Sequence, residues 1–183
     1  MVALVAKEPT VPLVSRTGRH LQRYCQTGLR QVVGCIPYRL KEIKQQTEFE
    51  IDEEDIEVLL ISSQKGKGML FPKGGWETDE SKEQAASRET VEEAGVTGLV
   101  ERELGTWKFK SKSHDTYYEG IMFSLLVKEQ LEIWPEKNVR KRTWMSVAEA
   151  RKACQYLWMK EALDRLVEQR QQRDEEKLVH HSL

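Results

Sequence analysis

The sequence has little of what marks several classes of protein. Its 183 residues include only three cysteines, Cys25, Cys35 and Cys154, which lie far apart and form no CxxC pair. This distribution excludes a zinc ribbon or a disulfide framework and predicts reduced thiols inside a cell. The longest apolar runs, such as residues 121–127, are too short to span a bilayer, so no membrane contact is expected.

An excess of one charge sign is also lacking. Lysine and arginine number 29 against 30 aspartates and glutamates, which gives a formal net charge of -1. Net charge therefore predicts no bulk attraction to nucleic acid, and we expect no stable nucleic-acid complex. Any anion-binding site must come from local clusters of basic residues.

The first residues contain no continuous apolar core of a secretory signal. Residues 1–23 carry Arg16, Arg19 and Arg23 but a single acidic residue, Glu8, a composition faintly similar to an organelle transit peptide. The sequence predicts an intracellular protein of the cytoplasm or nucleus, with the mitochondrion as the alternative. It does not indicate an oligomeric state.

Length and a 39% apolar content predict one domain with one core. We expect an N-terminal extension over residues 1–17 that need not be ordered, a folded domain over 18–167, and a charged, frayed tail over 168–183. Residue patterns predict strands over 31–40, 55–62, 69–71, 96–104, 107–109 and 117–127, and helices over 80–94 and 146–167. This alternation predicts an α/β or α+β fold, a mixed sheet with helices on its faces.

The chemistry concentrates on the first of these helices. Thr78 or Asp79 can cap its start, and Gly95 stands where a helix ends. Glu89, Glu92 and Glu93 have the spacing i, i+3 and i+4, which places three carboxylates on one side. Such groups repel one another unless a hard divalent cation such as Mg²⁺ neutralises them, although glutamate-rich helices are usually only solvated surfaces.

Other positions of the same segment fit this interpretation. Arg88 can pair with Glu92 one turn later. Ala85 and Ala86 are expected on the carboxylate side, where small side chains leave room for an approaching group. The backbone at Gly74 and Gly75 is free to approach the same metal.

The segment as a whole resembles a known motif. It reads Gly74, five residues, Glu80, seven residues, and then RETVEEAGV over residues 88–96. This resembles the Nudix box, GX5EX7REUXEEXGU, in which U is a bulky apolar residue. Thr90 at the first U departs from the pattern, whereas Val96 matches the second.

The resemblance implies a Nudix fold, a mixed sheet sandwiched between helices, and a metal-dependent hydrolase with Mg²⁺, or Mn²⁺ as a substitute. It implies that Glu89 and Glu93 bind metal, and that Glu92 binds metal, acts as general base, or does both. Gly74 is expected to offer its carbonyl to a metal, and Glu80 to cap or brace the box.

The rest of the chain bears on the substrate. The segments LLISS, FPKGGWE, LEIWPE and RKRTW resemble the diphosphoinositol polyphosphate phosphohydrolase branch, particularly its plant-type relatives. A small, highly anionic phosphate substrate needs a basic site. The expected substrate-binding residues are Lys73, Arg30, Arg39, Ser62, Ser63, Lys65, Arg140 and Arg142, with Lys67 and Lys141 as further candidates.

Two other functions stay open. One is a Nudix pyrophosphatase that acts on dinucleoside polyphosphates, ADP-ribose or other nucleoside diphosphate derivatives, and the other is a non-catalytic inositol phosphate sensor. Stacking of Trp76, Trp134 or Trp144 on a base would favour the first, but packing in the core or at its rim is the expectation for these side chains.

Overall fold

A single mixed sheet forms the centre of the molecule. The computed structural model describes residues 14–42, 51–65, 67–111 and 115–181. Seven strands are present: β1 (Arg30–Leu40), β2 (Ile56–Ser62), β3 (Met69–Leu70), β4 (Lys73–Gly75), β5 (Val96–Lys110), β6 (Tyr117–Gln130) and β7 (Arg142–Ser146). The main order is β3-β2-β1-β6-β5, with β4 paired to β1 and β7 to β2. Only β1 and β6 run parallel among these pairs.

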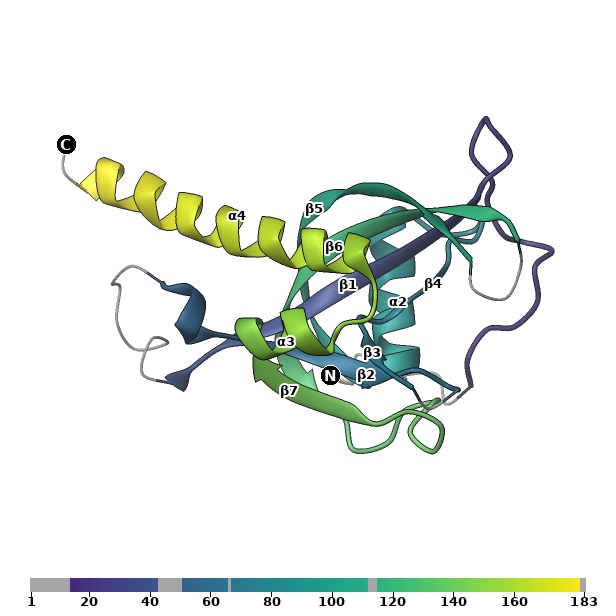
Figure 1. Ribbon diagram of the computed structural model, residues 1–183, viewed down its shortest axis with the longest axis horizontal. Coiled ribbons are helices and arrows are strands. Elements are labelled where there is room, and N and C mark those ends of the chain that lie inside the picture. The colour runs from purple at the N-terminus through teal and green to yellow at the C-terminus, as the bar shows by residue number, and fades with distance from the viewer. Residues whose placement is uncertain (1–13, 43–50, 66, 112–114, 182–183) are drawn as a thin grey trace, which may run out of the picture.

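Helices cover both faces of this sheet (Figure 1). Helix α2 (Lys82–Ala94) lies on one face, and α3 (Val147–Ala153) and α4 (Leu157–His181) lie on the other. A short 3-10 turn, Glu53–Asp55, precedes β2. The expected α+β fold, with a mixed sheet between helices, is confirmed. Within the described part of the chain, no helix is long and apolar enough to cross a membrane.

Alternation along β1 separates two apolar layers. Val33 and Cys35 point toward α2 and join one buried cluster with Ala85 and Ala86. Ile36 belongs to the other cluster, which includes Leu163 and Leu166 of α4. Successive strand residues face opposite sides, so a fully buried central strand supplies both layers. The predicted face of β6, with Ile121, Phe123 and Leu125, packs against α2.

Two predicted boundaries were wrong. The strands expected at 96–104 and 107–109 form one strand, β5, because register shifts near Val100 and Glu103 absorb the interruption without ending the pairing with β6. The helix expected over 146–167 is two helices, because Cys154 at the end of α3 adopts an extended backbone (φ -68°, ψ 127°). Apolar spacing is similar on both sides of this break, so periodicity alone did not reveal it.

The C-terminal tail was also expected to fray from residue 168, but α4 continues to His181. Two arginines hold this part of the helix to the sheet. Arg170 donates a hydrogen bond to the Tyr38 hydroxyl at 3.4 Å, and Arg173 binds Glu101, which also accepts a hydrogen bond from that hydroxyl. Hydrogen bonds and an ion pair thus stabilise this end of α4. The spacing of apolar residues gives no indication of such contacts.

We expect Leu163→Ala to destabilise the protein strongly, because Leu163 is fully buried between α4 and the sheet. Truncation of such a side chain leaves a cavity and costs about 2–5 kcal/mol. The matched control is Leu157→Ala, since Leu157 is 72% exposed. Urea unfolding followed by circular dichroism measures both, and equal free energies of unfolding would contradict this account of the core.

Candidate functional site

Helix α2 starts later than the sequence indicated. Ser81, not Thr78 or Asp79, is the N-cap: its hydroxyl accepts a hydrogen bond from the Gln84 N–H at 3.1 Å, and the Gln84 side chain accepts one from the Ser81 N–H. This reciprocal capping leaves Glu80 in the loop before the helix. The Glu80 side chain is therefore available to bind groups that hold this loop in place.

Glu80 and Arg88 brace the glycine loop against the helix. The Arg88 guanidinium donates to Glu80 from Nε at 2.9 Å and from Nη2 at 2.6 Å, and Nη2 also donates to the Gly75 carbonyl at 2.9 Å. Its Nη1 reaches Glu89 at 2.7 Å and Glu92 at 3.4 Å. The expected pairing with Glu92 is present, but Glu80 and Glu89 are the nearer partners. The predicted bracing role of Glu80 is confirmed.

The three carboxylates are buried together. Glu89, Glu92 and Glu93 are only 8%, 3% and 7% exposed. Glu93 accepts hydrogen bonds from the Lys73 main-chain N–H at 2.9 Å and from Arg140 at 2.8 Å. Glu92 accepts from the main-chain N–H of Arg16, which lies 3.3 Å from each carboxylate oxygen. Each carboxylate thus has a donor from a different part of the chain.

Burial and mutual repulsion change the protonation of these groups. Burial, with the charges of Glu93 and Glu92 and against the opposing effect of Arg88, raises the pKa of Glu89 to about 8. Burial likewise raises the pKa of Glu92 and of Glu93, against the opposing effect of their hydrogen-bond donors. Among the described residues, no three histidine, cysteine or acidic side chains already converge as a metal site. Arg88, Arg140 and N–H groups supply the counter-charge instead.

Gly74 lies directly against Glu89. A Cβ atom at Gly74 would stand 2.0 Å from a carboxylate oxygen of Glu89, closer than atoms can pack. Only glycine lets the loop backbone approach this carboxylate, so the predicted proximity of Gly74 to the acidic group is present.

One expectation about α2 was wrong, and the departure from the motif has a structural explanation. Ala85 and Ala86 do not line open space on the carboxylate side, because both are fully buried against β1 and β6. Their small size instead lets the helix pack close to the sheet. Thr90, the departure from the motif, is fully buried and donates its hydroxyl to the Ala86 carbonyl at 2.8 Å. That hydrogen bond satisfies the extra polar group.

Lys73 lies beside Glu93 and Glu89, and Arg30 lies close enough to Lys73 to affect its pKa. Burial, together with the charges of Arg140 and Arg30 and against the attraction of Glu93 and Glu89, lowers the pKa of Lys73. Arg30 hydrogen-bonds Gln22 and lies 5.2 Å from the centre of the Tyr118 ring. Lys73 therefore lies between the acidic group and Arg30 in its charge interactions.

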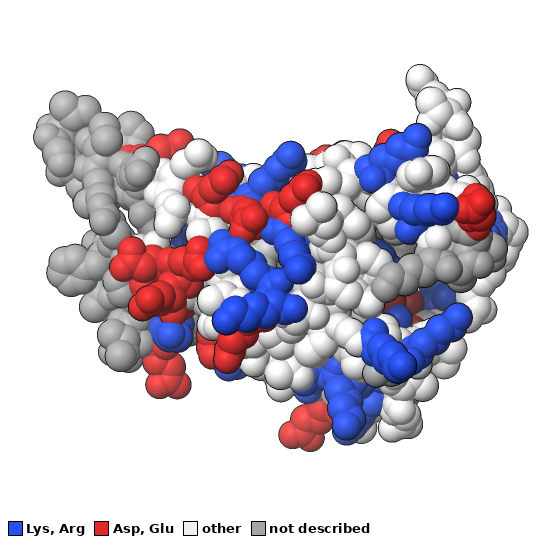
Figure 2. All heavy atoms as spheres, in the orientation of Figure 1, with Lys and Arg blue, Asp and Glu red and all other residues white. Residues whose placement is uncertain are grey.

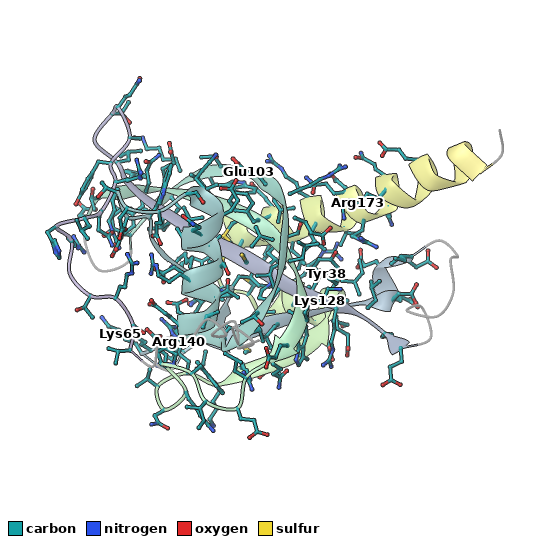
Figure 3. The ribbon with its side chains drawn as sticks, turned by 180° about the vertical axis from the view of Figure 1, so that it is seen from behind. Tyr38, Lys65, Glu103, Lys128, Arg140 and Arg173 are labelled. Carbon is teal, nitrogen blue, oxygen red and sulfur yellow. The ribbon has the colours of Figure 1, made fainter. Side chains whose placement is uncertain are left out.

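Arg140 is bound on three sides. Besides Glu93, it donates to Glu136 at 2.5 Å and to the Ser62 carbonyl at 3.1 Å. The Ser62 hydroxyl accepts from the Lys141 N–H at 2.9 Å, so the end of β2 is joined to the segment before β7. Figure 3 shows Lys65 and Arg140 at the same end of the molecule, away from Tyr38 and Lys128. Lys65 is exposed there, and Lys67 lies in the same turn.

Three expected substrate residues have structural partners elsewhere. Arg142 donates to the carbonyls of Ala94 and Gly95 at 3.1 and 2.9 Å and lies over the Trp134 ring, so it closes the C-terminal end of α2. Gly95 itself has the left-handed conformation (φ 63°) expected of a helix end.

Arg39 is not brought to the carboxylates. It pairs with Glu57 at 2.8 Å and lies over Trp144, five residues beyond the pairing of Gly34 with Lys73, or about 17 Å along the strand. Ser63 donates to the Lys67 carbonyl at 3.2 Å and closes a turn. Trp76, Trp134 and Trp144 pack at the core or its rim, as expected.

The sequence did not reveal two polar residues of this site, Arg16 and Glu136. Arg16 belongs to the expected extension, yet it contacts Glu92 and binds Glu77 and Asp79 with its side chain. Glu136 binds Arg140, and its main-chain N–H donates to the Glu92 carbonyl at 3.0 Å. No periodicity marks these contacts, although Glu136 and Arg140 fall in the flanking segments LEIWPE and RKRTW.

Comparison with known families agrees with this geometry. The model of the NUDIX domain matches residues 49–166. The chain belongs to the Nudix family. It is 63% identical over 161 residues to Nudix hydrolase 17, mitochondrial, from Arabidopsis thaliana, covering 88% of this chain and 86% of that protein. Members of the family hydrolyse phosphoanhydride bonds, generally with divalent metal ions, and this Nudix chain is such a hydrolase.

Two further proteins resemble this Nudix hydrolase, one in sequence and the other in fold. Diphosphoinositol polyphosphate phosphohydrolase 2 from Rattus norvegicus is 35% identical over 135 residues, covering 72% of this chain and 66% of that protein. A solved NUDIX hydrolase from Nitrosomonas europaea superposes with a TM-score of 0.60 at 21% identity, covering 78% of this chain and 91% of that one. The solved structure supports the fold alone.

The raised pKa of Glu89 predicts a pH-dependent stability without divalent cations. Folding favours the protonated carboxyl, so this contribution is complete below the ordinary pKa of 4.5 and is lost as pH rises through about 8. We expect Glu89→Gln to be more stable than the native protein at about pH 8, by on the order of 1 kcal/mol, and to lose less stability between about pH 5 and 8.

Thermal unfolding in a chelator across this pH range measures the effect. Glu83→Gln is the matched control, because Glu83 is an exposed carboxylate on the same helix. Parallel pH profiles for the native protein and Glu89→Gln would contradict the assigned protonation.

Proposed function

We propose that this Nudix hydrolase removes the terminal phosphate of diphosphoinositol polyphosphates. The observation that carries the proposal is the pair Lys73 and Arg140 beside the buried carboxylates, with Arg30 near Lys73, in a chain without net positive charge. A substrate with many phosphates around a ring needs several cations next to the hydrolytic group. The name of the 35% identical relative supports the same substrate class.

Further positive charge lies next to this group. Although burial opposes it, hydrogen bonds with Ser111 and Arg30 and the charges of Arg19 and Arg30 lower the pKa of the Tyr118 hydroxyl. Figure 2 shows that basic side chains prevail on the right half of the visible face, whereas acidic ones are frequent on the left. Basic side chains thus cluster locally although the chain has no net positive charge.

The residues present fit a divalent cation. Three buried carboxylates with raised pKa values lie on one turn of helix, and the missing Cβ of Gly74 leaves backbone beside Glu89. Carboxylate and carbonyl oxygens are the ligands that Mg²⁺ takes, and Mn²⁺ accepts the same set. We propose that Glu89, Glu93, Glu92 and the Gly74 carbonyl hold Mg²⁺, which offsets negative charge on the phosphoryl oxygens.

The raised pKa of Glu92 suits it to accept a proton. In the proposed reaction, a water oxygen attacks the terminal phosphorus while its proton passes to the Glu92 carboxylate. The bond between that phosphorus and the bridging oxygen breaks, and the bridging oxygen leaves with the inositol polyphosphate. Lys73 and the neighbouring arginines bind and orient the remaining phosphates.

The alternative is a pyrophosphatase for dinucleoside polyphosphates, ADP-ribose or related nucleotides. Such a substrate offers fewer phosphates and a base to stack. The indole N–H of Trp76 is bound to the Glu80 carbonyl at 3.0 Å, Arg142 lies over the Trp134 ring and Arg39 over the Trp144 ring. These contacts favour the inositol substrate. The word mitochondrial in a relative's name supports the mitochondrion as the compartment of this chain.

The first experiment measures phosphate release from a diphosphoinositol polyphosphate and from diadenosine polyphosphates in parallel with Mg²⁺. We expect a preference for the inositol substrate and a loss of turnover of about 10²-fold or more in Glu92→Gln, because a positioned base contributes about 10²–10⁴-fold. Glu83→Gln, exposed on the same helix, is the control. A preference for the nucleotide would support the alternative, and binding without turnover of either would support a sensor.

A second variant tests the basic group. Lys73→Met should raise KM for the inositol substrate by about 10-fold, since a charged hydrogen bond to a phosphate contributes about 1.5–3 kcal/mol. The control is Lys128→Met, because Lys128 is an exposed lysine on β6, away from Lys65 and Arg140 (Figure 3). An unchanged KM in Lys73→Met would remove this residue from the substrate site.

A further inference from the structure

Main-chain hydrogen bonds join the segment before β1 to the loop of the Nudix box. The Arg23 N–H donates to the Trp76 carbonyl at 2.8 Å, and the Thr78 N–H donates to the Leu21 carbonyl at 2.8 Å. Between them, Gln22 and Glu77 form an antiparallel bridge. Residues 21–23 therefore form a short extended segment that lies along the loop leading into α2.

Arg16 lies before this extended segment, and its side chain binds the same loop. Its Nη1 donates to Glu77 at 2.5 Å and to Asp79 at 3.0 Å, and Glu77 is only 5% exposed. Both acceptors belong to the loop between β4 and α2. Because two carboxylates engage the guanidinium, the position of the Arg16 backbone is fixed relative to the box.

The anchored backbone contacts the proposed base. The Arg16 N–H lies 3.3 Å from both carboxylate oxygens of Glu92, and the Ser15 hydroxyl donates to Glu136 at 3.3 Å. Arg88 reaches Glu92 only at 3.4 Å, whereas it binds Glu89 at 2.7 Å. Glu92 is thus oriented by the main-chain N–H of Arg16 together with the longer contact from Arg88.

We propose that Arg16 is a positioning residue of the hydrolytic reaction: its ion pairs with Glu77 and Asp79 place its main-chain N–H against Glu92. The inference rests on the proposed role of Glu92 as the base. The proposal gives the segment before β1 a part in the reaction itself. It does not make the Arg16 side chain a phosphate ligand, because the Nη1 donor of that side chain already has two carboxylate acceptors.

A double-mutant cycle in the full chain tests this role. We expect Arg16→Gln and Asp79→Asn each to lower kcat, by about 10-fold for Arg16→Gln, out of the roughly 10²–10⁴-fold that a positioned base contributes. KM and the affinity for inositol hexakisphosphate should stay within about two-fold, since the substrate phosphates are bound elsewhere. The double variant should be little worse than Arg16→Gln, because both changes remove one interaction.

Other results would overturn the proposal. A raised KM with unchanged kcat, or weaker binding of inositol hexakisphosphate, would make Arg16 a phosphate ligand. Fully additive effects of the two changes on kcat would show that Arg16 and Asp79 act independently. Arg102→Gln, which removes an exposed arginine on β5, is the control for loss of charge. The cycle uses whichever phosphoanhydride substrate the native protein cleaves, so a wrong substrate assignment does not affect its outcome.

A second measurement does not depend on turnover. We expect the Arg16 amide proton to be protected from exchange with solvent in the native protein and to exchange about 10-fold faster in Glu92→Ala, as NMR of the labelled full chain can measure. Equal exchange rates in both proteins would show that this amide is not held by Glu92 and would overturn the proposal even if no substrate is turned over.

Discussion

Three carboxylates buried on one turn of α2 impose the constraint on which the rest of the structure depends. Glu89, Glu92 and Glu93 have little contact with water, so protein groups must supply the counter-charge. These groups come from the helix itself, from β4, from the segment before β7 and from the residues before β1. Segments distant in sequence therefore converge on one helix turn, and this convergence defines the site.

The same constraint explains why the sequence predicted this part of the molecule well. Helical spacing is a local property, and it places the carboxylates of residues 89, 92 and 93 together without knowledge of the fold. Gly95 at the helix end and the bracing of Glu80 are also local, and the structure confirms both. The strand pattern of β1 and β2 predicted the sheet because buried strands are rich in apolar residues.

Tertiary partners were beyond such local patterns. Arg39, Arg140 and Arg142 are all arginines near strand ends, yet one lies over a tryptophan beside Glu57, one binds Glu93 and one closes a helix. Their sequence surroundings do not separate these roles, because each role depends on a group supplied by another element. Arg16 was missed for the same reason, and α4 extends past its expected end because its partners, Tyr38 and Glu101, lie on the sheet.

The central position of β1 has a consequence for how the chain folds. This early strand pairs in parallel with β6, so that Val33 lies beside Ile121, whereas its antiparallel partner β4 pairs through Gly34 and Lys73. Contacts between residues so far apart in sequence form slowly, because a long loop must close before the pairing stabilises it. During synthesis the acidic helix therefore leaves the ribosome before the strand that completes its packing surface. Until then its carboxylates remain in water, and both apolar faces of β1 stay exposed to chaperones and to aggregation.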